Sequence, residues 1–243
     1  MKILYQEWDV KTQSGKKFSQ FGQKRILYLG LDPFHYADGA DGANGVDRGL
    51  ITHWPIIRIA PIPFSDPTIQ QALADFEIYT HVIMTSKTSV SILCDYLIQH
   101  GLNLDLWKKK STIAVGKITA HQLKRFGITP NTIASDETAE GIIAELEKMP
   151  LKQANIFWPH SKKARPVIKD FLKEKKIPFL DCALYDTLYQ APLPHPNLSD
   201  YEEIVFTSPS TVEAFKQIFG ALPKFARLTA IGPVTQKALD NLT

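Results

Sequence analysis

A strand–hydroxyl–helix segment at 203–212 is the feature that most constrains how this chain can fold. Residues 204–206 are all apolar, and all three are β-branched or aromatic, which is typical of a short buried strand. Ser208 then fits a helix N-cap, and Pro209 fits the first helical position, where the missing N–H of proline costs nothing. Apolar residues at three- and four-residue steps, closed by Gly220, complete a helix. The segment therefore predicts a helix N-terminus at the carboxyl end of a strand, where anionic ligands bind in open α/β sheets.

The same segment occurs twice in the chain. Residues 79–90 match residues 201–212 at a constant offset of 122, with tyrosine, threonine, serine and valine at corresponding places. A second pair follows, because 113–119 resembles 229–235: each has a short apolar stretch, a glycine and a threonine three residues later. One such turn is common, but two motifs repeated in one order indicate a duplication. We therefore expect a duplicated α/β fold with a cleft between the copies.

Composition limits the possible partners and compartments. The 243 residues are 44% hydrophobic, enough for one large or two small domains, and the net charge of +3 is far from that of a nucleic-acid-binding protein. A mildly basic protein still suits a small polyanion. Cys94 and Cys182 lie in apolar contexts without metal-ligand spacing, so we expect buried thiols in a reducing compartment. We find no membrane span or secretory signal and expect a soluble, cytoplasmic protein without membrane or nucleic-acid partners.

Two extended stretches suggest how the copies are connected. One lies near 54–62 and the other near 179–190, and they flank a block that holds one full repeat. The simplest arrangement is a discontinuous domain made of 1–54 and 187–243, linker strands at 55–61 and 181–186, and a second domain at 62–180. The linker strands are expected to pair with each other.

Three other patterns have weaker functional interpretations. The glycines of 38–45 lack dinucleotide-loop spacing, so a flexible loop is the better interpretation. Lys117 follows a glycine, as in a Walker loop, but Ser111 stands where that motif needs glycine. A basic helix is predicted over 160–175, with Arg165 able to face the cleft. His160 and its serine neighbour are better explained as surface polar residues than as a catalytic pair, since adjacent residues do not face each other.

A set of short motifs, taken together, resembles the uroporphyrinogen-III synthase family. The set is Phe-Thr-Ser-Pro-Ser at 206–210, Ala-Ile-Gly-Pro-Val-Thr at 230–235, Val-Gly-Lys-Ile-Thr at 115–119, Thr-Ala-Glu-Gly at 138–141 and Leu-Tyr-Asp-Thr at 184–187. The resemblance runs from about residue 50 to the end. Two departures are an Asp32-Pro step where the family has Arg-Pro, and a chain that stops at Thr243 where the family continues with another strand and helix.

The resemblance implies both a fold and a reaction. The fold is two flavodoxin-like, parallel-sheet α/β domains joined by a two-stranded linker. The reaction closes the linear tetrapyrrole hydroxymethylbilane to uroporphyrinogen III, with loss of water and inversion of ring D. No metal or organic cofactor is implied, the partner is a small polycarboxylate, and we expect a monomer. The eight carboxylates of the substrate suit a cleft lined by helix N-termini, backbone N–H groups and hydroxyls.

The resemblance also implies site residues. Tyr185 matches the family's linker tyrosine and is the candidate to hydrogen-bond the departing hydroxyl; its alternative role is an aromatic that packs between the domains. The candidate substrate-binding residues are Thr85, Ser86, Gly116, Thr119, Arg165, Thr207, Ser208, Ser210, Gly232 and Thr235. For any single serine or threonine of this set, plain helix capping is the alternative. For the whole chain, the alternative is a two-lobed small-molecule-binding or regulatory protein without catalysis, which would not determine the isomer formed.

Overall fold

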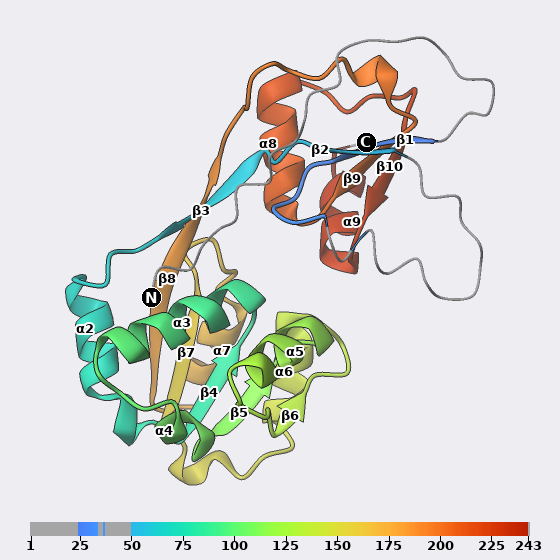
Figure 1. The fold of residues 1–243 in the computed structure, drawn as a ribbon. Helices are drawn as coiled ribbons and strands as arrows, with labels where there is room; N and C mark the ends of the chain where they lie inside the picture. Colours follow the sequence, from blue (N-terminus) through green and yellow to red (C-terminus); the bar gives the residue numbers. More distant parts are fainter. Residues whose placement is uncertain (1–23, 34–35, 37–49, 243) are drawn as a thin grey trace.

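Two sheets organise the chain (Figure 1). The computed structural model describes residues 24–33, 36 and 50–242, and the Gly-rich segment 38–45 lies outside these residues. The first sheet has the strand order β10 (Arg227–Ala230), β9 (Glu203–Phe206), β1 (Arg25–Tyr28), β2 (Leu50–His53). The second has the order β3 (Ile57–Pro61), β8 (Phe179–Tyr189), β7 (Ile156–Ser161), β4 (His81–Met84), β5 (Ser111–Ala114), β6 (Thr132–Ile133). All neighbouring strands are parallel except the antiparallel pair β3 and β8.

Helices connect the strands. The first sheet carries α8 (Pro209–Phe219) and α9 (Pro233–Asp240), with the 3₁₀ turn η4 (Leu198–Asp200) before β9. The second carries α2 (Pro67–Ala74), α3 (Lys87–Gln99), α4 (Asp105–Lys108), α5 (Lys117–Arg125), α6 (Ala139–Leu146) and α7 (Val167–Glu174), with the 3₁₀ turns η2 (Phe76–Ile78) and η3 (Leu151–Gln153). The predicted α/β class with parallel sheets is confirmed.

The sequence repeat is also a structural repeat. β4 and α3 correspond to β9 and α8 at the offset of 122, and β5 and α5 correspond to β10 and α9. The strand order β5–β4–β7–β8 of the second sheet therefore has the same form as the order β10–β9–β1–β2 of the first. Each copy thus places two strand–helix turns side by side at one edge of its sheet.

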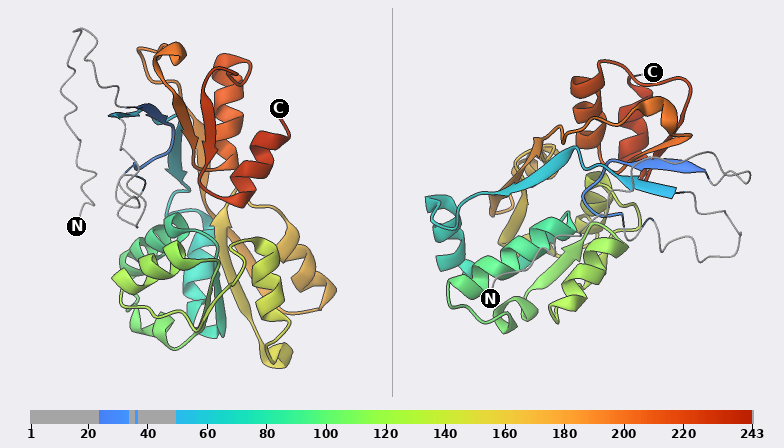
Figure 2. Two further views of the ribbon diagram at one scale, coloured as in Figure 1. Left: turned by 90° about the vertical axis from the view of Figure 1, so that its right-hand side faces the viewer. Right: turned by 45° about the horizontal axis from the view of Figure 1, so that its top comes forward.

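Helices cover both faces of the second sheet, as parallel strands require. Val82 and Met84 of β4 face a core shared with α2, α3 and α5, whereas Ile83 faces a core shared with α6 and α7. The left view of Figure 2 shows these helices on opposite sides of the sheet. In the first sheet, Ile204 and Phe206 pack against α8 and α9, while Val205 points to the other face. Burial on both faces explains why these strands are continuous apolar runs rather than alternating ones.

Strand β8 belongs to the second sheet but continues toward the first (Figure 1). Its first part pairs in parallel with β7, and its last residues pair with β3 in an antiparallel ladder from Ile57 opposite Tyr189 to Pro61 opposite Tyr185. The β7–β8 register shifts where His160 lies opposite Ala183 but Ser161 lies opposite Tyr185. A bulge of this kind bends a strand and re-aims a side chain. The domain boundaries given above stay a proposal.

One predicted helix begins later than expected. We predicted a helix over 160–175, but His160 and Ser161 end β7, and α7 begins only at Val167. Pro166 is the reason, because a proline disfavours helical backbone at the residue before it, Arg165. Pro166 itself occupies the N-cap position, so Arg165 lies in a turn and not on the helix.

Candidate functional site

Helices α3, α5, α8 and α9 each begin directly after a strand, and their N-cap residues belong to the motifs repeated in the sequence. Ser86 caps α3 by accepting a hydrogen bond from Ser89 N at 3.0 Å, and Ser208 caps α8 by accepting one from Thr211 N at 3.4 Å. Gly116 and Gly232 are the N-caps of α5 and α9 and have no side chain to fill that role. We call the end of each sheet at which its parallel strands have their carboxyl ends the carboxyl edge. The carboxyl edge of each sheet has one serine cap beside one glycine cap, and amide groups of the first helical turn point toward it.

Tyr185 lies at the same edge of the second sheet as the cap of α3. Its hydroxyl is 3.1 Å from Ser86 Oγ, and Ser86 Oγ is in turn 2.9 Å from Ser89 Oγ. The tyrosine side chain is 6% exposed and packs in the core beneath α3. The structure thus brings the candidate catalytic tyrosine and one candidate binding serine together from β8 and α3. Because either hydroxyl can donate, the pair can pass a proton without moving a heavy atom.

The corresponding edge of the first sheet is organised by Thr211, which sequence reasoning missed. Its Oγ1 accepts hydrogen bonds from Thr207 N at 3.1 Å and from Ser208 N at 3.2 Å, and it donates to Ser208 O at 2.7 Å. The signal was available, since a hydroxyl residue three positions after a serine cap can form a capping box. Ser210 is partly exposed in the same turn.

Thr207 also contacts the end of β1. A Cβ atom added to Gly30 would lie 2.4 Å from Thr207 Cγ2 and 2.6 Å from its Oγ1. A side chain at position 30 is therefore excluded unless Thr207 moves, and the glycine allows the chain after β1 to pass against the turn before α8. Thr85, at the equivalent place in the second sheet, is partly buried.

A carboxylate already occupies the N-terminus of α5. Glu137 Oε1 accepts a hydrogen bond from Lys117 N at 3.0 Å, and the same side chain lies against Gly116, where an added Cβ would be 2.4 Å from Glu137 Cδ. Sequence reasoning missed this residue because it directly precedes the motif at 138–141. Its position shows that the glycine cap has the space and the donor needed to hold a carboxylate.

Thr119 and Thr235 occupy matching positions in the first turns of α5 and α9. Each side chain is only 4% exposed. Both threonines are thus largely covered by the surrounding protein. Any role in binding would fall mainly on the backbone and on the shape of the turn.

The comparisons with known proteins agree with this geometry. The sequence model of the uroporphyrinogen-III synthase family (HemD) matches residues 48–243, which contain both repeats. The chain belongs to the uroporphyrinogen-III synthase family. The porphyrin biosynthesis protein HemD of Ruminiclostridium josui is 30% identical over 193 residues, which are 73% of this chain. The matched region is 36% of that relative, so the chain spans little more than a third of its length.

Other relatives match the chain along most of their length. The uroporphyrinogen-III synthase of Chlorobaculum parvum is 22% identical over 204 residues, 78% of each protein. A variant of uroporphyrinogen III synthase from Thermus thermophilus superposes with a TM-score of 0.62 at 19% identity, covering 90% of this chain and 89% of that structure. The Helicobacter pylori enzyme gives 0.53 at 17% identity, with coverage of 90% and 89%. These structural likenesses show a shared fold.

Arg165 has a different environment from the other candidate residues of this synthase-family chain. Its guanidinium makes a bidentate pair with Glu140, with both N–O distances 2.7 Å. The hydrogen bonds from Arg165 lower the pKa of the Glu140 carboxyl to about 2. The pair ties the turn before α7 to the first turn of α6, so Arg165 would have to leave Glu140 before it could bind a substrate carboxylate.

His160 is not the surface residue we expected. Its ring lies against Trp158 with centroids 4.2 Å apart and planes tilted by 34°, its Nδ1 lies 2.8 Å from Ser161 O, and its Nε2 is buried without a partner. Burial lowers the pKa of the imidazole. The neutral form is therefore favoured, and Nδ1–H donates to the Ser161 carbonyl because a carbonyl oxygen can only accept. Both cysteines are buried as predicted, and burial raises the pKa of each thiol to about 12.

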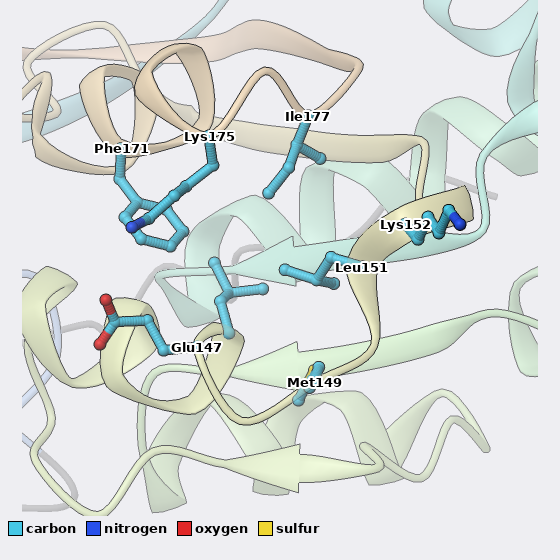
Figure 3. A pocket seen from close by; sticks show the side chains of 8 residues that line it. Glu147, Met149, Leu151, Lys152, Phe171, Lys175 and Ile177 are labelled. Atoms are coloured by element: carbon cyan, nitrogen blue, oxygen red, sulfur yellow. The ribbon is translucent and has the colours of Figure 1, made fainter.

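A surface depression elsewhere in this family member is not part of the candidate site. It has a volume of about 410 Å³ and is lined by Leu146, Glu147, Met149, Leu151, Lys152, Phe171, Lys175 and Ile177 (Figure 3). These residues surround the last turns of α6 and α7, at the end of the sheet opposite the serine and glycine caps. Among the described residues there is also no group of histidine, cysteine and acidic side chains that could hold a metal, and no helix long and apolar enough to cross a membrane.

Proposed function

We propose that this chain is a uroporphyrinogen-III synthase that closes hydroxymethylbilane to uroporphyrinogen III, with loss of water and inversion of ring D. The family assignment supports the reaction class. The structural observation that most supports this function is the hydroxyl pair of Tyr185 and Ser86 at the carboxyl edge of the second sheet. This pair stands beside helix N-termini suited to the carboxylates of the substrate.

The first chemical step is departure of the terminal hydroxyl of the substrate. In this proposal the Tyr185 hydroxyl donates its proton to the leaving oxygen as the terminal C–O bond breaks, so that the oxygen departs as water. The N–H proton of the resulting azafulvenium then returns to the tyrosine oxygen, which gives the neutral azafulvene. When the Tyr185 hydroxyl donates to the leaving oxygen, the Ser86 hydroxyl can donate to the tyrosine oxygen and so hold it in position. Because the leaving group is already labile, the assistance needed is modest, of the order of 10- to 100-fold in rate.

The second requirement is geometric. Spontaneous closure of the resulting azafulvene gives the uninverted isomer, so the protein must hold the chain ends such that the substituted position of ring D attacks through a spiro intermediate. Hydroxyl and amide groups of both sheets are proposed to hold the carboxylates. The hydroxyls belong to Thr85 and Ser86 in the second sheet and to Thr207, Ser208 and Ser210 in the first, and the amide groups lie at Gly116 and Gly232. In this scheme the choice of isomer depends mainly on how the protein positions the substrate.

The proposal extends to the organisation of the molecule. Residues 62–180 form one domain, 1–54 with 187–243 form the other, and the linker strands 55–61 and 181–186 allow them to close on the substrate. We further propose that the protein is a cytoplasmic monomer that needs neither metal nor organic cofactor.

The test of the function is the identity of the cyclic product. Purified protein is given hydroxymethylbilane in the presence of a chelator, the product is oxidised, and isomers I and III are separated by chromatography. Formation of isomer III above the protein-free control supports the proposal. Formation of isomer I alone, as in the protein-free control, would contradict it.

A further inference from the structure

Three lysines lie at one level along the carboxyl edge of the second sheet. Met84 of β4 pairs with Ala114 of β5, and Lys87 and Lys117 follow these two residues by three positions. On the other side of β4, Val82 pairs with Phe157 of β7. Continuing this register by two residues brings Met84 opposite residue 159, and Lys162 follows residue 159 by three positions. We call Lys87, Lys117 and Lys162 the lysine row.

Among the residues that the structure describes, the first sheet has no such row at the equivalent level. Ala230 of β10 pairs with Phe206 of β9, and three positions beyond them stand Pro233 and Pro209. Leu29 N donates to Val205 O on the other side of β9, and the residue three positions after Leu29 is Asp32. The two halves of the duplication therefore differ in charge where their strand–helix turns coincide, with three lysines in one half and two prolines and an aspartate in the other.

The helix dipole opposes two of these lysines. Lys87 and Lys117 are the first residues of α3 and α5, where the positive end of the macrodipole disfavours a cation, and neither helix has an acidic residue in its first turn. Elsewhere in the same half, lysine ammonium groups pair with carboxylates, as in Lys108 with Asp105 and Lys169 with Asp181. In the described part of the chain no ion pair involves the ammonium group of any lysine of the row.

The same edge holds a carboxylate in this structure. Glu137 Oε1 lies 3.0 Å from Lys117 N, against the glycine cap of α5. This contact is made by the backbone, and it leaves the lysine ammonium for a second anion. The row also adjoins Tyr185, since Lys162 N donates to Tyr185 O at 2.8 Å. A ligand bound along the row would therefore lie next to the hydroxyl pair.

We propose that the lysine row binds the carboxylates of the tetrapyrrole, so that the second sheet supplies cationic contacts to the polyanion, whereas the described strand–helix turns of the first sheet supply hydroxyl and amide groups. This inference rests on the proposed function, because that function supplies a ligand with several carboxylates. The unfavourable placement of the lysines on the helix dipole is then offset when an anion binds.

The experiment compares two triple variants that lose the same charge. The test variant carries Lys87→Gln, Lys117→Gln and Lys162→Gln. The control carries Lys124→Gln, Lys173→Gln and Lys216→Gln, which are exposed lysines in the last turns of α5, α7 and α8. Binding of uroporphyrinogen III is measured by anaerobic equilibrium dialysis at low and high salt, and melting temperatures are recorded without ligand.

We expect the lysine-row variant to bind about thirtyfold more weakly at low salt, which is about threefold for each exposed ion pair, and the control less than twofold more weakly. The salt dependence of binding should flatten only in the lysine-row variant. Its melting temperature should stay unchanged or rise, because the substitutions remove cations from helix N-termini. This readout separates a loss of binding from a loss of folding.

Two results would overturn the inference: equal binding by the wild-type protein and the lysine-row variant, or an equal loss in both triple variants. The outcome is distinguishable from a failure of the proposed function. If the protein produces isomer III but the lysine-row variant binds uroporphyrinogen III as tightly as the wild-type protein, only the inference is contradicted. Lysine-dependent binding without isomer III contradicts only the function.

Discussion

At the scale of single residues, the account depends on a hydroxyl pair formed by residues 99 positions apart. Tyr185 is nominated by its place in the second connector, but only the fold shows that Ser86 is its partner at 3.1 Å. The tyrosine is also largely buried, so its ring packs against its neighbours while its hydroxyl pairs with Ser86. One substitution separates these two contributions.

Replacement of Tyr185 by phenylalanine should lower turnover about 10- to 100-fold and leave the melting temperature nearly unchanged, because the ring and its packing remain. The matched control is Tyr96→Phe, which removes a hydroxyl that donates to Ile62 O in the same core cluster. The control should cost about 1 kcal/mol of stability without loss of turnover. Full activity of Tyr185→Phe would leave catalysis to positioning alone.

The partly buried His160 should make stability depend on pH. Burial lowers its pKa in the folded protein, so the unfolded chain binds a proton as pH falls below about 6.5 while the folded protein does not. The free energy of unfolding should therefore decrease on acidification through this range, by at most about 1.4 kcal/mol per pH unit for one proton. Asp181, which raises this pKa, and Lys169, which lowers it, are the charged neighbours that act on the ring.

Urea unfolding between pH 5.5 and 7.5 measures this dependence. His160→Asn, which can keep the hydrogen bond made by Nδ1, should flatten it, whereas the exposed His121→Asn should not. Equal pH dependence of the wild-type protein and the His160 variant would show that another group is responsible.

At the scale of elements, much of the architecture is readable in the sequence because it is encoded locally. Ser208, Pro209 and Gly220 fix the ends of α8 through capping chemistry that involves only near neighbours, and the helix has the predicted bounds. The helix predicted over 160–175 was wrong at its start for an equally local reason. Pro166 disfavours helical backbone at the residue before it, so α7 begins only at Val167.

What the sequence did not reveal depends on sheet register. Glu137 reaches Gly116 across 21 positions, a contact with no periodic or local signature. His160 lies two residues after Trp158 on the same strand, but the burial of its Nε2 depends on how the sheet packs in the fold. The site is therefore predictable as a set of turns, but the contacts between the turns require the fold.

The close approach of β1 and β9 gives an element-scale prediction. Gly30→Ala should destabilise the protein by about 1–3 kcal/mol, because its Cβ would overlap Thr207 Cγ2 at 2.4 Å. Adding Thr207→Ala should restore part of that loss, and a double-mutant cycle from chemical unfolding measures the coupling. Additive effects of the two substitutions would mean that the two turns do not touch in solution.

At the scale of the whole molecule, β8 and β3 connect the two sheets, and side chains reinforce the connection. Tyr189 donates its hydroxyl to Glu213 of α8, and the Lys163 ammonium lies 3.8 Å from the centre of the Tyr189 ring. These contacts join the loop after β7 to a helix of the first sheet. A pair of sheets with few connections is suited to hinge closure around a ligand.

Binding of uroporphyrinogen III should therefore reduce the radius of gyration, because a polyanion that contacts both carboxyl edges favours the closed arrangement. Small-angle scattering with and without the ligand tests this, and dialysis under the same conditions establishes that the ligand is bound. Saturated binding with an unchanged radius of gyration would contradict closure.

If this chain controls which isomer forms, the share of isomer III should depend on protein concentration. Enzymatic closure competes with spontaneous closure of hydroxymethylbilane, so the isomer III share should rise from the protein-free value toward completeness, with chelator present throughout. Heat-denatured protein should give the protein-free value. A product that remains isomer I at every concentration of folded protein would contradict the account.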